Sequence, residues 1–239
     1  MSTTKPIAVQ LYSLRDALSE DFEGIVRKLA EVGYLGVEPW ANMPVSAADA
    51  ARLFKELDLT VPSAHLGIPT GDNQSKILDD AAAYGIKRVI VPYQPREEFT
   101  SVDGVKRIAD ALNAGYEVCK ANNLEFGYHN HDFEFTLVDG RLAYDLLLEH
   151  IDPNILMQID TYWVKGGGQD AAELVKRMGT RSPLLHIKDG PAEPGKAMTA
   201  VGDGVMDVPA IVTAGDENTE WLIVELDACD TDMFEAVAK

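Results

Sequence analysis

Short apolar segments that end in polar side chains recur along this chain, each about one strand and one helix after the last. The polar residues near their ends are Gln10, Glu38, His65, Tyr93, Asn130, Asp160, His186 and Glu225. Successive members are 26 to 39 residues apart, which is about the length of one βα unit. Eight such units in sequence predict a (β/α)8 barrel, the TIM barrel, whose usual length is roughly 250 residues.

An open, doubly wound sheet is the alternative, because it is built from the same units. Such a sheet normally binds its ligand at one crevice, whereas here polar residues recur at nearly every strand end. We therefore expect the barrel. The 239 residues fit one domain, residues 1–239.

The element boundaries follow from apolar runs and from capping residues. The expected strands cover residues 7–12, 35–39, 60–65, 88–93, 124–131, 155–160, 184–189 and 221–227. A helix is expected over 21–32 with Gly33 as its C-terminal cap, and another from Ser46, a good N-cap, to Leu57. The last helix, over 232–238, is too short to cover the eighth strand. Either the chain is trimmed there or a neighbouring subunit covers that side, as in a homo-oligomer.

Charge and composition narrow the class of partner. The net charge of −18 comes from 39 acids against 21 bases, which disfavours binding to a phosphate backbone. No apolar run reaches the roughly 18 residues of a membrane span. Residues 1–6 lack the apolar stretch of a signal peptide, and the two cysteines lack metal-site spacing. We expect a cytoplasmic protein that binds a small molecule and neither nucleic acid nor membrane.

Three strand ends carry side chains that commonly bind metals. Asp160, His186 and Glu225 follow strongly apolar runs on consecutive expected strands. Burying such groups without partners costs several kcal/mol each, and adjacent strands lie about 4.8 Å apart, so their ends can meet on one ion. A mixed oxygen and nitrogen site of this kind suits Mn²⁺, Mg²⁺, Co²⁺ or Zn²⁺.

Other residues near the strand ends are candidates for contact with a substrate. His129 and His131 alternate along one strand and should share a face, with Tyr128 and Asn130 on the other. Lys188 can stabilise an oxyanion or simply pair with Asp189.

Glu38 and His65 can bind a hydroxyl group or transfer a proton, or can make plain structural hydrogen bonds. Trp40 and Trp163 offer flat surfaces for a sugar, or simply pack at the rim.

At these residues the chain resembles the sugar phosphate isomerase/epimerase family of xylose isomerase-like TIM barrels. The most specific matching motifs are Tyr128-His129-Asn130-His131-Asp132-Phe133-Glu134-Phe135, Asp160-Thr161-Tyr162-Trp163, His186-Ile187-Lys188-Asp189 and Val201-Gly202-Asp203-Gly204. The resemblance implies one divalent metal, with Asp160, His186 and Glu225 among its ligands.

The fifth strand departs from the family pattern. Many relatives carry a Glu inside this strand where the chain has Tyr128. The ion must then recruit Glu134 or His131 or keep extra water. We expect Glu134, because a third carboxylate offsets the dication better than a second imidazole. Without the strand-five Glu, proton transfer between two carboxylates on opposite faces of a substrate is doubtful.

The sequence favours a metal-dependent isomerase or epimerase that acts next to the carbonyl of a sugar or keto-sugar. Glu225 is the expected base, with Lys188 and His65 as catalytic partners and with Glu38, His129, His131, Trp163 and Trp40 as substrate contacts. The alternatives are a lyase or hydratase for a keto-sugar, of the 3-keto-glycoside or inosose type, and a non-catalytic sugar-binding barrel. The superfamily's zinc endonucleases are disfavoured, because the chain has five His and is strongly acidic.

Overall fold

The computed structural model describes residues 5–239. Residues 1–4, the beginning of the stretch that lacks a signal-peptide pattern, lie outside the described part. Within residues 5–239, no helix is both long and apolar enough to cross a membrane.

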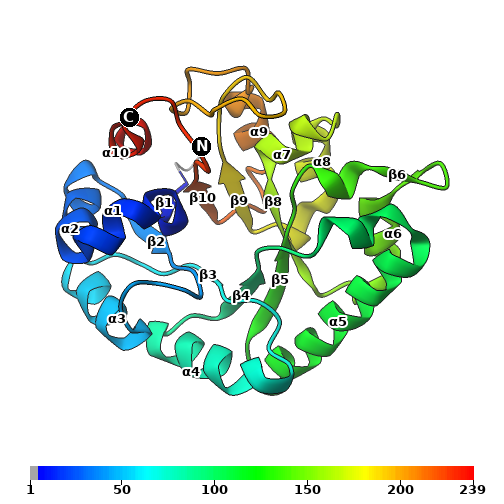
Figure 1. The fold of residues 1–239 in the computed structure, drawn as a ribbon, viewed down its shortest axis with the longest axis horizontal. Helices are drawn as coiled ribbons and strands as arrows, with labels where there is room; N and C mark the ends of the chain where they lie inside the picture. The colour runs from blue at the N-terminus through cyan, green and yellow to red at the C-terminus, as the bar shows by residue number, and fades with distance from the viewer. Residues whose placement is uncertain (1–4) are drawn as a thin grey trace.

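Eight parallel strands form the centre of the molecule (Figure 1). In chain order they are β1 (Ile7–Gln10), β2 (Gly36–Glu38), β3 (Ala64–His65), β4 (Arg88–Val91), β5 (Glu125–His129), β8 (Leu156–Asp160), β9 (Leu184–Ile187) and β10 (Trp221–Val224). They lie side by side in the order β2-β1-β10-β9-β8-β5-β4-β3. Parallel bridges Gly36↔Thr60 and Trp40↔His65 join the two ends of this sheet. The predicted (β/α)8 barrel is confirmed.

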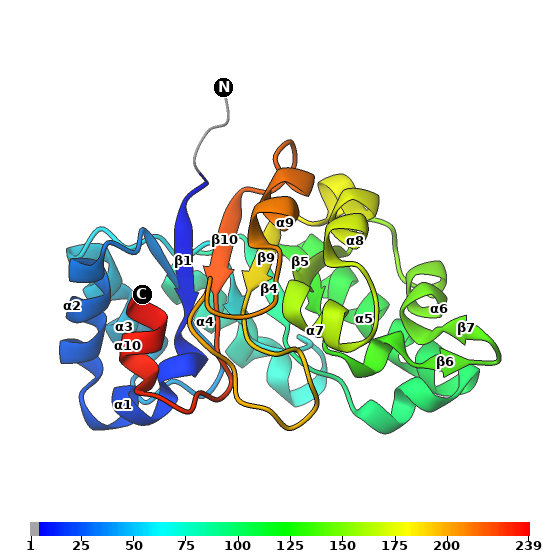
Figure 2. The ribbon, with the colours of Figure 1, turned by 90° about the horizontal axis from the view of Figure 1, so that it is seen from above.

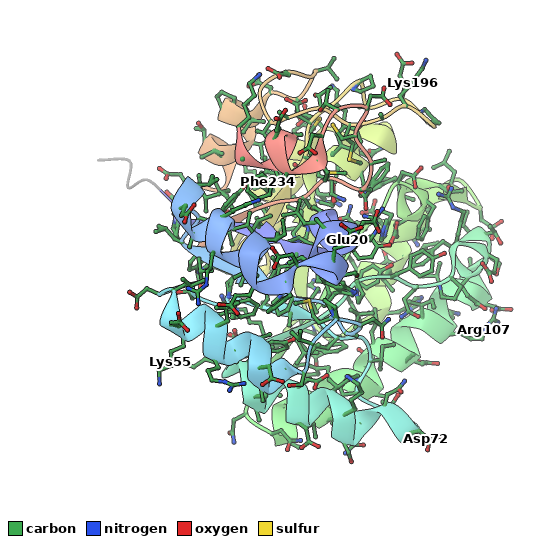
Figure 3. All side chains as sticks on the ribbon, turned by 60° about the vertical axis from the view of Figure 1, so that its left-hand side comes forward. Glu20, Lys55, Asp72, Arg107, Lys196 and Phe234 are labelled. Atoms are coloured by element: carbon green, nitrogen blue, oxygen red, sulfur yellow. The ribbon has the colours of Figure 1, made fainter. Side chains whose placement is uncertain are left out.

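Helices surround the strands on the outside (Figure 1). They are α1 (Arg15–Glu20), α2 (Phe22–Val32), α3 (Ala47–Glu56), α4 (Gln74–Tyr84), α5 (Val102–Ala121), α6 (Ala143–His150), α7 (Thr161–Gly166), α8 (Ala171–Met178), α9 (Val208–Ala214) and α10 (Met233–Ala238). Charged side chains such as Lys55 and Arg107 project outward from these helices (Figure 3). The last helix, α10, has six residues.

Two of the capping predictions are confirmed. Ser46 accepts a hydrogen bond from the Asp49 N–H at the start of α3. Gly33 ends α2 with φ of 107°, a left-handed conformation that glycine adopts without a Cβ clash.

Some elements differ from the sequence prediction. Over the expected strand 60–65, only Ala64 and His65 form a regular strand, and Thr60 makes an isolated bridge to Gly36. The first strand ends at Gln10, because its side chain accepts the Tyr12 N–H and begins a 3-10 turn. The short helix α7 and the hairpin of β6 (Leu137–Val138) and β7 (Arg141–Leu142) were not predicted.

The inside of the barrel is apolar at one end and polar at the other. Ala8, Ile90, Leu184 and Ile223 form a small apolar cluster inside it. Two residues further along the same strands come Gln10, His186 and Glu225, all buried. Because side chains alternate across a strand, residues at i and i+2 share the inner face. The polar side chains therefore gather at the carboxyl ends of the strands, the end from which the loop 190–207 extends (Figure 2).

Candidate metal centre and substrate cavity

Glu38 lies at the centre of the polar layer inside the barrel. Its Oε1 accepts hydrogen bonds from Ser63 and from Gln158 Nε2 at 2.7 Å, and its Oε2 accepts from Gln10 Nε2 at 2.8 Å and His186 Nε2 at 2.7 Å. Burial raises the pKa of Glu38, but His65 and His186 outweigh burial and lower it to about 2. Glu38 is therefore an ionised acceptor with no exposed surface, and it positions His186.

His186 lies between two carboxylates. Its Nε2 contacts Glu38 as above, and its Nδ1 lies 2.8 Å from Glu225 Oε2. Burial lowers the pKa of His186, but these carboxylates raise it to about 10. A histidine that donates Nε2–H to a carboxylate presents Nδ1 to a metal, a common arrangement in metalloproteins. Metal binding would then displace the Nδ1 proton.

His129 presents a free ring nitrogen to the same centre. Its Nδ1 lies 3.2 Å from Gln158 Oε1, which fixes a proton on Nδ1 and leaves a lone pair on Nε2. Burial lowers the pKa of His129 well below its usual value, with a further contribution from His186, so the ring is neutral. Nε2 lies 3.6 Å from Asp160 Oδ2.

Asp160 supplies a carboxylate oxygen that lacks a conventional donor. Its Oδ1 caps α7 by accepting the Trp163 N–H at 2.9 Å. Its buried Oδ2 receives no hydrogen bond of good geometry from the described residues, although Lys188 Nζ lies 2.9 Å away. Burial raises the pKa of Asp160 to about 6, against the lowering effect of Lys188.

These side chains form a group with the composition of a metal site. One ligand atom each from His129, Asp160, His186 and Glu225 lies within 4.8 Å of the others. Two properties fit a divalent ion: the lone pair of His129 Nε2 and Asp160 Oδ2, which accepts no hydrogen bond of good geometry from the described residues, both face the centre of the group. The tautomers of His129 and His186 also fit a metal site, because in each ring the nitrogen that does not face the centre donates its N–H to a protein acceptor.

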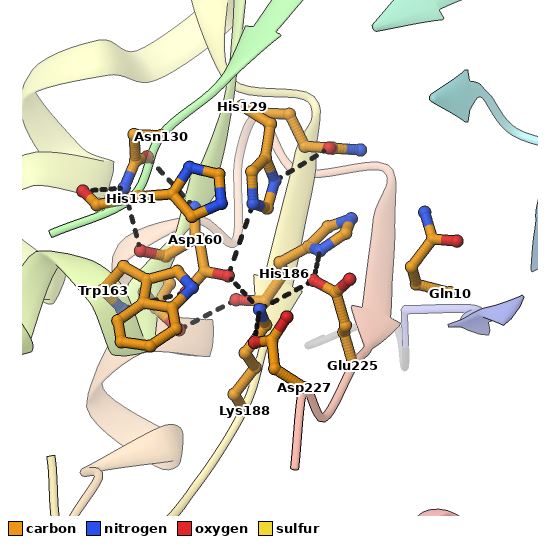
Figure 4. A network of polar contacts seen from close by, with 12 residues as sticks. Gln10, His129, Asn130, His131, Asp160, Trp163, His186, Lys188, Glu225 and Asp227 are labelled. Carbon is orange, nitrogen blue, oxygen red and sulfur yellow. Dashed lines mark hydrogen bonds and ion pairs between the residues drawn. The ribbon is translucent and has the colours of Figure 1, made fainter. Parts of the chain in front are cut away.

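The Lys188 side chain extends its ammonium group into this group of residues (Figure 4). Its Nζ lies 2.8 Å from Glu225 Oε2 and 2.6 Å from Asp227 Oδ2, in addition to its contact with Asp160. Burial lowers the pKa of Lys188, but the three carboxylates outweigh burial and hold it well above its usual value. The ammonium group is therefore permanently charged and almost fully buried.

A cavity of about 360 Å³ opens directly beside the group. Its lining residues are Tyr12, Trp40, Ala41, Asn42, His65, Pro92, Tyr93, His129, His131, Lys188, Glu225 and Asp227. A volume of this size suits a small ligand. A larger hollow of about 680 Å³ lies at the opposite end of the barrel, lined by residues such as Arg88 and Glu220. Those two side chains are paired with each other, and chemistry in this fold occurs at the carboxyl ends of the strands.

Four aromatic side chains surround the metal-ligand group, namely those of His131, His65, Trp40 and Trp163. His131 and His65 both line the cavity, and His65 Nε2 lies 2.6 Å from Gln158 Oε1. Trp40 lies on the cavity wall with its ring edge-on to Tyr12. The Trp163 ring lies over Lys188, with Nζ 5.4 Å from its centroid.

Glu134 lies outside the ligand group. Its Oε1 accepts a hydrogen bond from the Tyr128 hydroxyl at 2.6 Å, and its Oε2 accepts the His131 N–H at 2.9 Å. Tyr128 itself faces outward into the core between strands and helices. Burial raises the pKa of Glu134 to about 7. The strand-five residue that faces the centre is therefore His129, neither Tyr128 nor Glu134.

The structure thus brings together Asp160, His186 and Glu225, adds His129, and leaves Glu134 apart. Glu38 lies beneath the centre and does not reach the cavity. Sequence reasoning missed Gln158 and Asp227. Gln158 could have been found from its spacing, because it lies two residues before Asp160 on the same face of β8.

Comparison with known proteins identifies the family of this chain. Residues 26–232 match the xylose isomerase-like TIM barrel family. The chain belongs to this family. A sugar phosphate isomerase/epimerase of Parabacteroides distasonis has a similar structure, with a TM-score of 0.84 and 26% sequence identity, covering 100% of this chain and 93% of that one.

Two further similar proteins are named as dehydratases. An inosose dehydratase of Mesomycoplasma hyopneumoniae is 25% identical over 194 residues, which cover 70% of this chain and 62% of that protein. The match therefore spans less than two thirds of this curated relative. A probable 3-DHS dehydratase of Bacillus anthracis shares the fold, with a TM-score of 0.72 at 14% identity, covering 98% of this chain and 97% of that one.

Proposed function

We propose that this chain is a metal-dependent enzyme that removes a proton next to the ketone of a sugar or keto-sugar, after which a β-hydroxyl group takes up a proton and leaves as water. The observation that carries the proposal is the buried group of His129, Asp160, His186 and Glu225 beside an open cavity. The curated relatives named inosose dehydratases support the choice of dehydration.

The metal would be held by two imidazole nitrogens and two carboxylate oxygens. This donor set suits Mn²⁺, Co²⁺ or Zn²⁺ better than Mg²⁺, which prefers oxygen ligands. When bound, the ion supplies Lewis-acid polarisation of the substrate carbonyl. The proposal replaces Glu134 with His129 as the strand-five ligand.

Glu225 is the proposed base. Its contacts with His186 and Lys188 all fall on Oε2, so Oε1 makes no hydrogen bond or ion pair with residues 5–239. Burial raises the pKa of Glu225, but Lys188 and His186 outweigh burial and hold it well below its usual value. A carboxylate of this kind is a weak base, so it needs a substrate proton made acidic by the polarised ketone.

Neutral histidines line the rest of the cavity. Burial lowers the pKa of His131 to about 3 and also lowers that of His65. Neutral imidazoles can donate and accept hydrogen bonds at the same time. We propose that His65 and His131 orient substrate hydroxyl groups and that Trp40 packs against the sugar.

The placement of the carboxylates favours dehydration over epimerisation. Epimerisation by two bases needs a proton-transfer group on each face of the substrate. Here Glu225 and Asp227 come from the end of β10, whereas β5 presents His129, a proposed ligand. An isomerase or epimerase is the second candidate, because the similar Parabacteroides structure is named as one.

The substrate is proposed to lack a phosphate group. Of the residues that line the cavity, as far as the chain is described, Lys188 is the one cation, and three carboxylates already surround it. TIM barrels often bind phosphate with the loops after strands seven and eight. In this chain the Asp189 carboxylate accepts the N–H groups of Gly190, Gly202 and Met206 in the loop after the seventh barrel strand.

The reaction is tested by incubating the protein with Mn²⁺ and a panel of inososes and 3-keto-glycosides in D₂O. Dehydration gives an unsaturated ketone that absorbs in the ultraviolet and has lost one water. Isomerisation or epimerisation gives a product of unchanged composition that carries deuterium. Turnover of neither kind, with sugar binding retained, would identify a non-catalytic barrel and overturn the proposal.

The ligand set is tested by Mn²⁺ titration of two variants. His129→Ala should weaken binding strongly, since loss of one ligand removes a coordinate bond. Glu134→Gln should leave the affinity close to that of the unmodified protein. The reverse result would restore Glu134 as the strand-five ligand. A cytoplasmic location and a homo-oligomeric state stay predictions.

A further inference from the structure

The end of the Lys188 side chain touches the carboxylate oxygens that face the metal centre. Nζ lies 2.9 Å from Asp160 Oδ2 and 2.8 Å from Glu225 Oε2, and both residues belong to the ligand group. Its third contact, at 2.6 Å, is with Asp227 Oδ2, outside that group. Figure 4 shows the ammonium group between the three carboxylates.

An ammonium group in this position competes with a divalent ion. Carboxylate ligands lie about 2.0–2.2 Å from a transition metal, so an ion bound by Asp160 and Glu225 would come within a few ångströms of Nζ. Two positive charges at such a short distance in a buried site repel each other strongly, because little water screens them. The ion and the ammonium group cannot both keep full contact with the same two oxygens.

Asp227 offers the ammonium group a second position. Its side chain is 36% exposed and lines the cavity, whereas Asp160 is fully buried. The Trp163 ring, 5.4 Å from Nζ, attracts a cation on the same side. A rotation of the flexible lysine side chain would break the contacts with Asp160 and Glu225 and keep the existing ion pair with Asp227, so the ammonium group would stay paired.

We propose that Lys188 is a built-in counter-ion of the metal site, which neutralises Asp160 and Glu225 when no ion is bound and shifts to Asp227 when an ion binds. The inference rests on the proposed function, because it takes the same two carboxylates as ligands. Two consequences follow. Lys188 lowers the affinity for the ion, and in the ion-bound protein its ammonium group stands at the cavity, within reach of a substrate oxygen.

Lys188→Met tests the competition directly. Free Mn²⁺ is measured by electron paramagnetic resonance during titration of the full-length protein. The variant should bind Mn²⁺ at least about tenfold more tightly, which corresponds to about 1.4 kcal/mol. Lys165→Met, which removes an exposed lysine of α7, is the matched control and should bind like the unmodified protein. In EDTA, Lys188→Met should melt at a lower temperature, and Mn²⁺ should restore more of its stability than in the control.

Asp227→Asn tests the shift, and it alters a partly exposed side chain, so it remains informative even if Lys188→Met folds poorly. Without Asp227, Lys188 has no second partner and stays on Asp160 and Glu225, so Mn²⁺ binding should weaken several-fold. In the Lys188→Met background the same substitution should have little effect, because the competing cation is gone. If Asp227→Asn weakens Mn²⁺ binding equally in both backgrounds, Asp227 acts only through its negative charge, and the proposed shift of Lys188 is wrong.

The outcomes separate this inference from the proposed function. If the unmodified protein binds Mn²⁺ and Lys188→Met binds no more tightly, the counter-ion role is wrong and the metal site stands. If only Lys188→Met binds Mn²⁺, Lys188 neutralises the two carboxylates, but the shift to Asp227 is wrong and the native enzyme does not depend on a metal. If neither binds Mn²⁺, both proposals fail.

Discussion

Glu225 combines two proposed roles in one side chain, as metal ligand and as base. Glu225→Gln keeps the size of the side chain and removes its charge. We expect a loss of turnover of at least about 100-fold, the usual scale for a general base, and weaker Mn²⁺ binding. Turnover is measured on a substrate identified by the product assay, and Mn²⁺ binding is measured by titration. Glu217→Gln, which alters an exposed position, is the control. An unchanged rate would remove Glu225 from the mechanism.

Glu134 is predicted to make stability depend on pH. Burial raises its pKa from an ordinary value of 4.5 to about 7 in the folded chain. Below the unfolded pKa both states are protonated, and the full stability is present. As the pH rises from about 4.5 to about 7, the unfolded chain loses its proton first, so stability falls by an amount on the order of 3 kcal/mol.

The measurement is urea unfolding in EDTA at pH 5 and pH 8. The unmodified protein should lose more stability between these pH values than Glu134→Gln, which cannot ionise. Other titrating groups contribute equally to both proteins and cancel in the comparison. Equal losses would mean that the Glu134 carboxyl group ionises as easily in the folded chain as in the unfolded one.

At the scale of elements, one side chain organises the long loop after β9. Asp189 is fully buried, and its carboxylate accepts three backbone N–H groups of the segment 190–206. Gly204 fits against it closely, since a Cβ at this position would lie 2.1 Å from Asp189 Oδ1. The Val201-Gly202-Asp203-Gly204 motif is therefore explained by how the loop closes on Asp189.

Asp189→Ala should loosen this loop. Unpaired buried N–H groups cost about 1–3 kcal/mol each, and part of that is regained when the loop opens to water. We expect a stability loss of about 2–4 kcal/mol and faster hydrogen–deuterium exchange in peptides covering 190–206. Asp203→Ala, at an exposed position of the same loop, should change neither. Unaltered exchange in Asp189→Ala would show that the loop is held by other contacts.

Element prediction succeeded where the signal is local. The caps at Ser46 and Gly33 depend on side-chain oxygens and on backbone conformations that neighbouring residues determine. It failed for α7, where Asp160 serves both as strand end and as N-cap, so that the strand runs directly into a helix. A residue with two structural roles gives no separate signal for each.

At the scale of the whole molecule, closure of the barrel depends on a small residue at the seam between β2 and the segment before β3. A Cβ at Gly36 would lie 2.7 Å from Thr60 O and 2.9 Å from Trp221 Cζ3. The Val37 N–H donates to the same Thr60 carbonyl at 2.9 Å. The two ends of the sheet can therefore approach only because position 36 lacks a side chain.

Gly36→Ala should strain this closure and lower the free energy of unfolding by about 1–3 kcal/mol, the usual cost of overpacking. Urea unfolding measures it. Gly166→Ala is the matched control, because a Cβ there meets its nearest neighbour, Trp163, at an ordinary 3.6 Å. A similar small change in both variants would mean that the seam has room to adjust.

The order of the eight barrel strands, the barrel itself and the chemical types at the strand ends could be predicted from the sequence, because alternation and capping are local properties. The sequence also brought Asp160, His186 and Glu225 to one place, since consecutive parallel strands end side by side. That His129 faces the centre, and Glu134 does not, follows from the three-dimensional arrangement alone. The register of β5 against β8 pairs His129 with Gln158 and Tyr128 with Met157, and that register turns Tyr128 outward, where its hydroxyl holds Glu134. The contact of Lys188 with three carboxylates also depends on the three-dimensional arrangement, because it joins side chains at the carboxyl ends of β8, β9 and β10 whose distances no local pattern fixes.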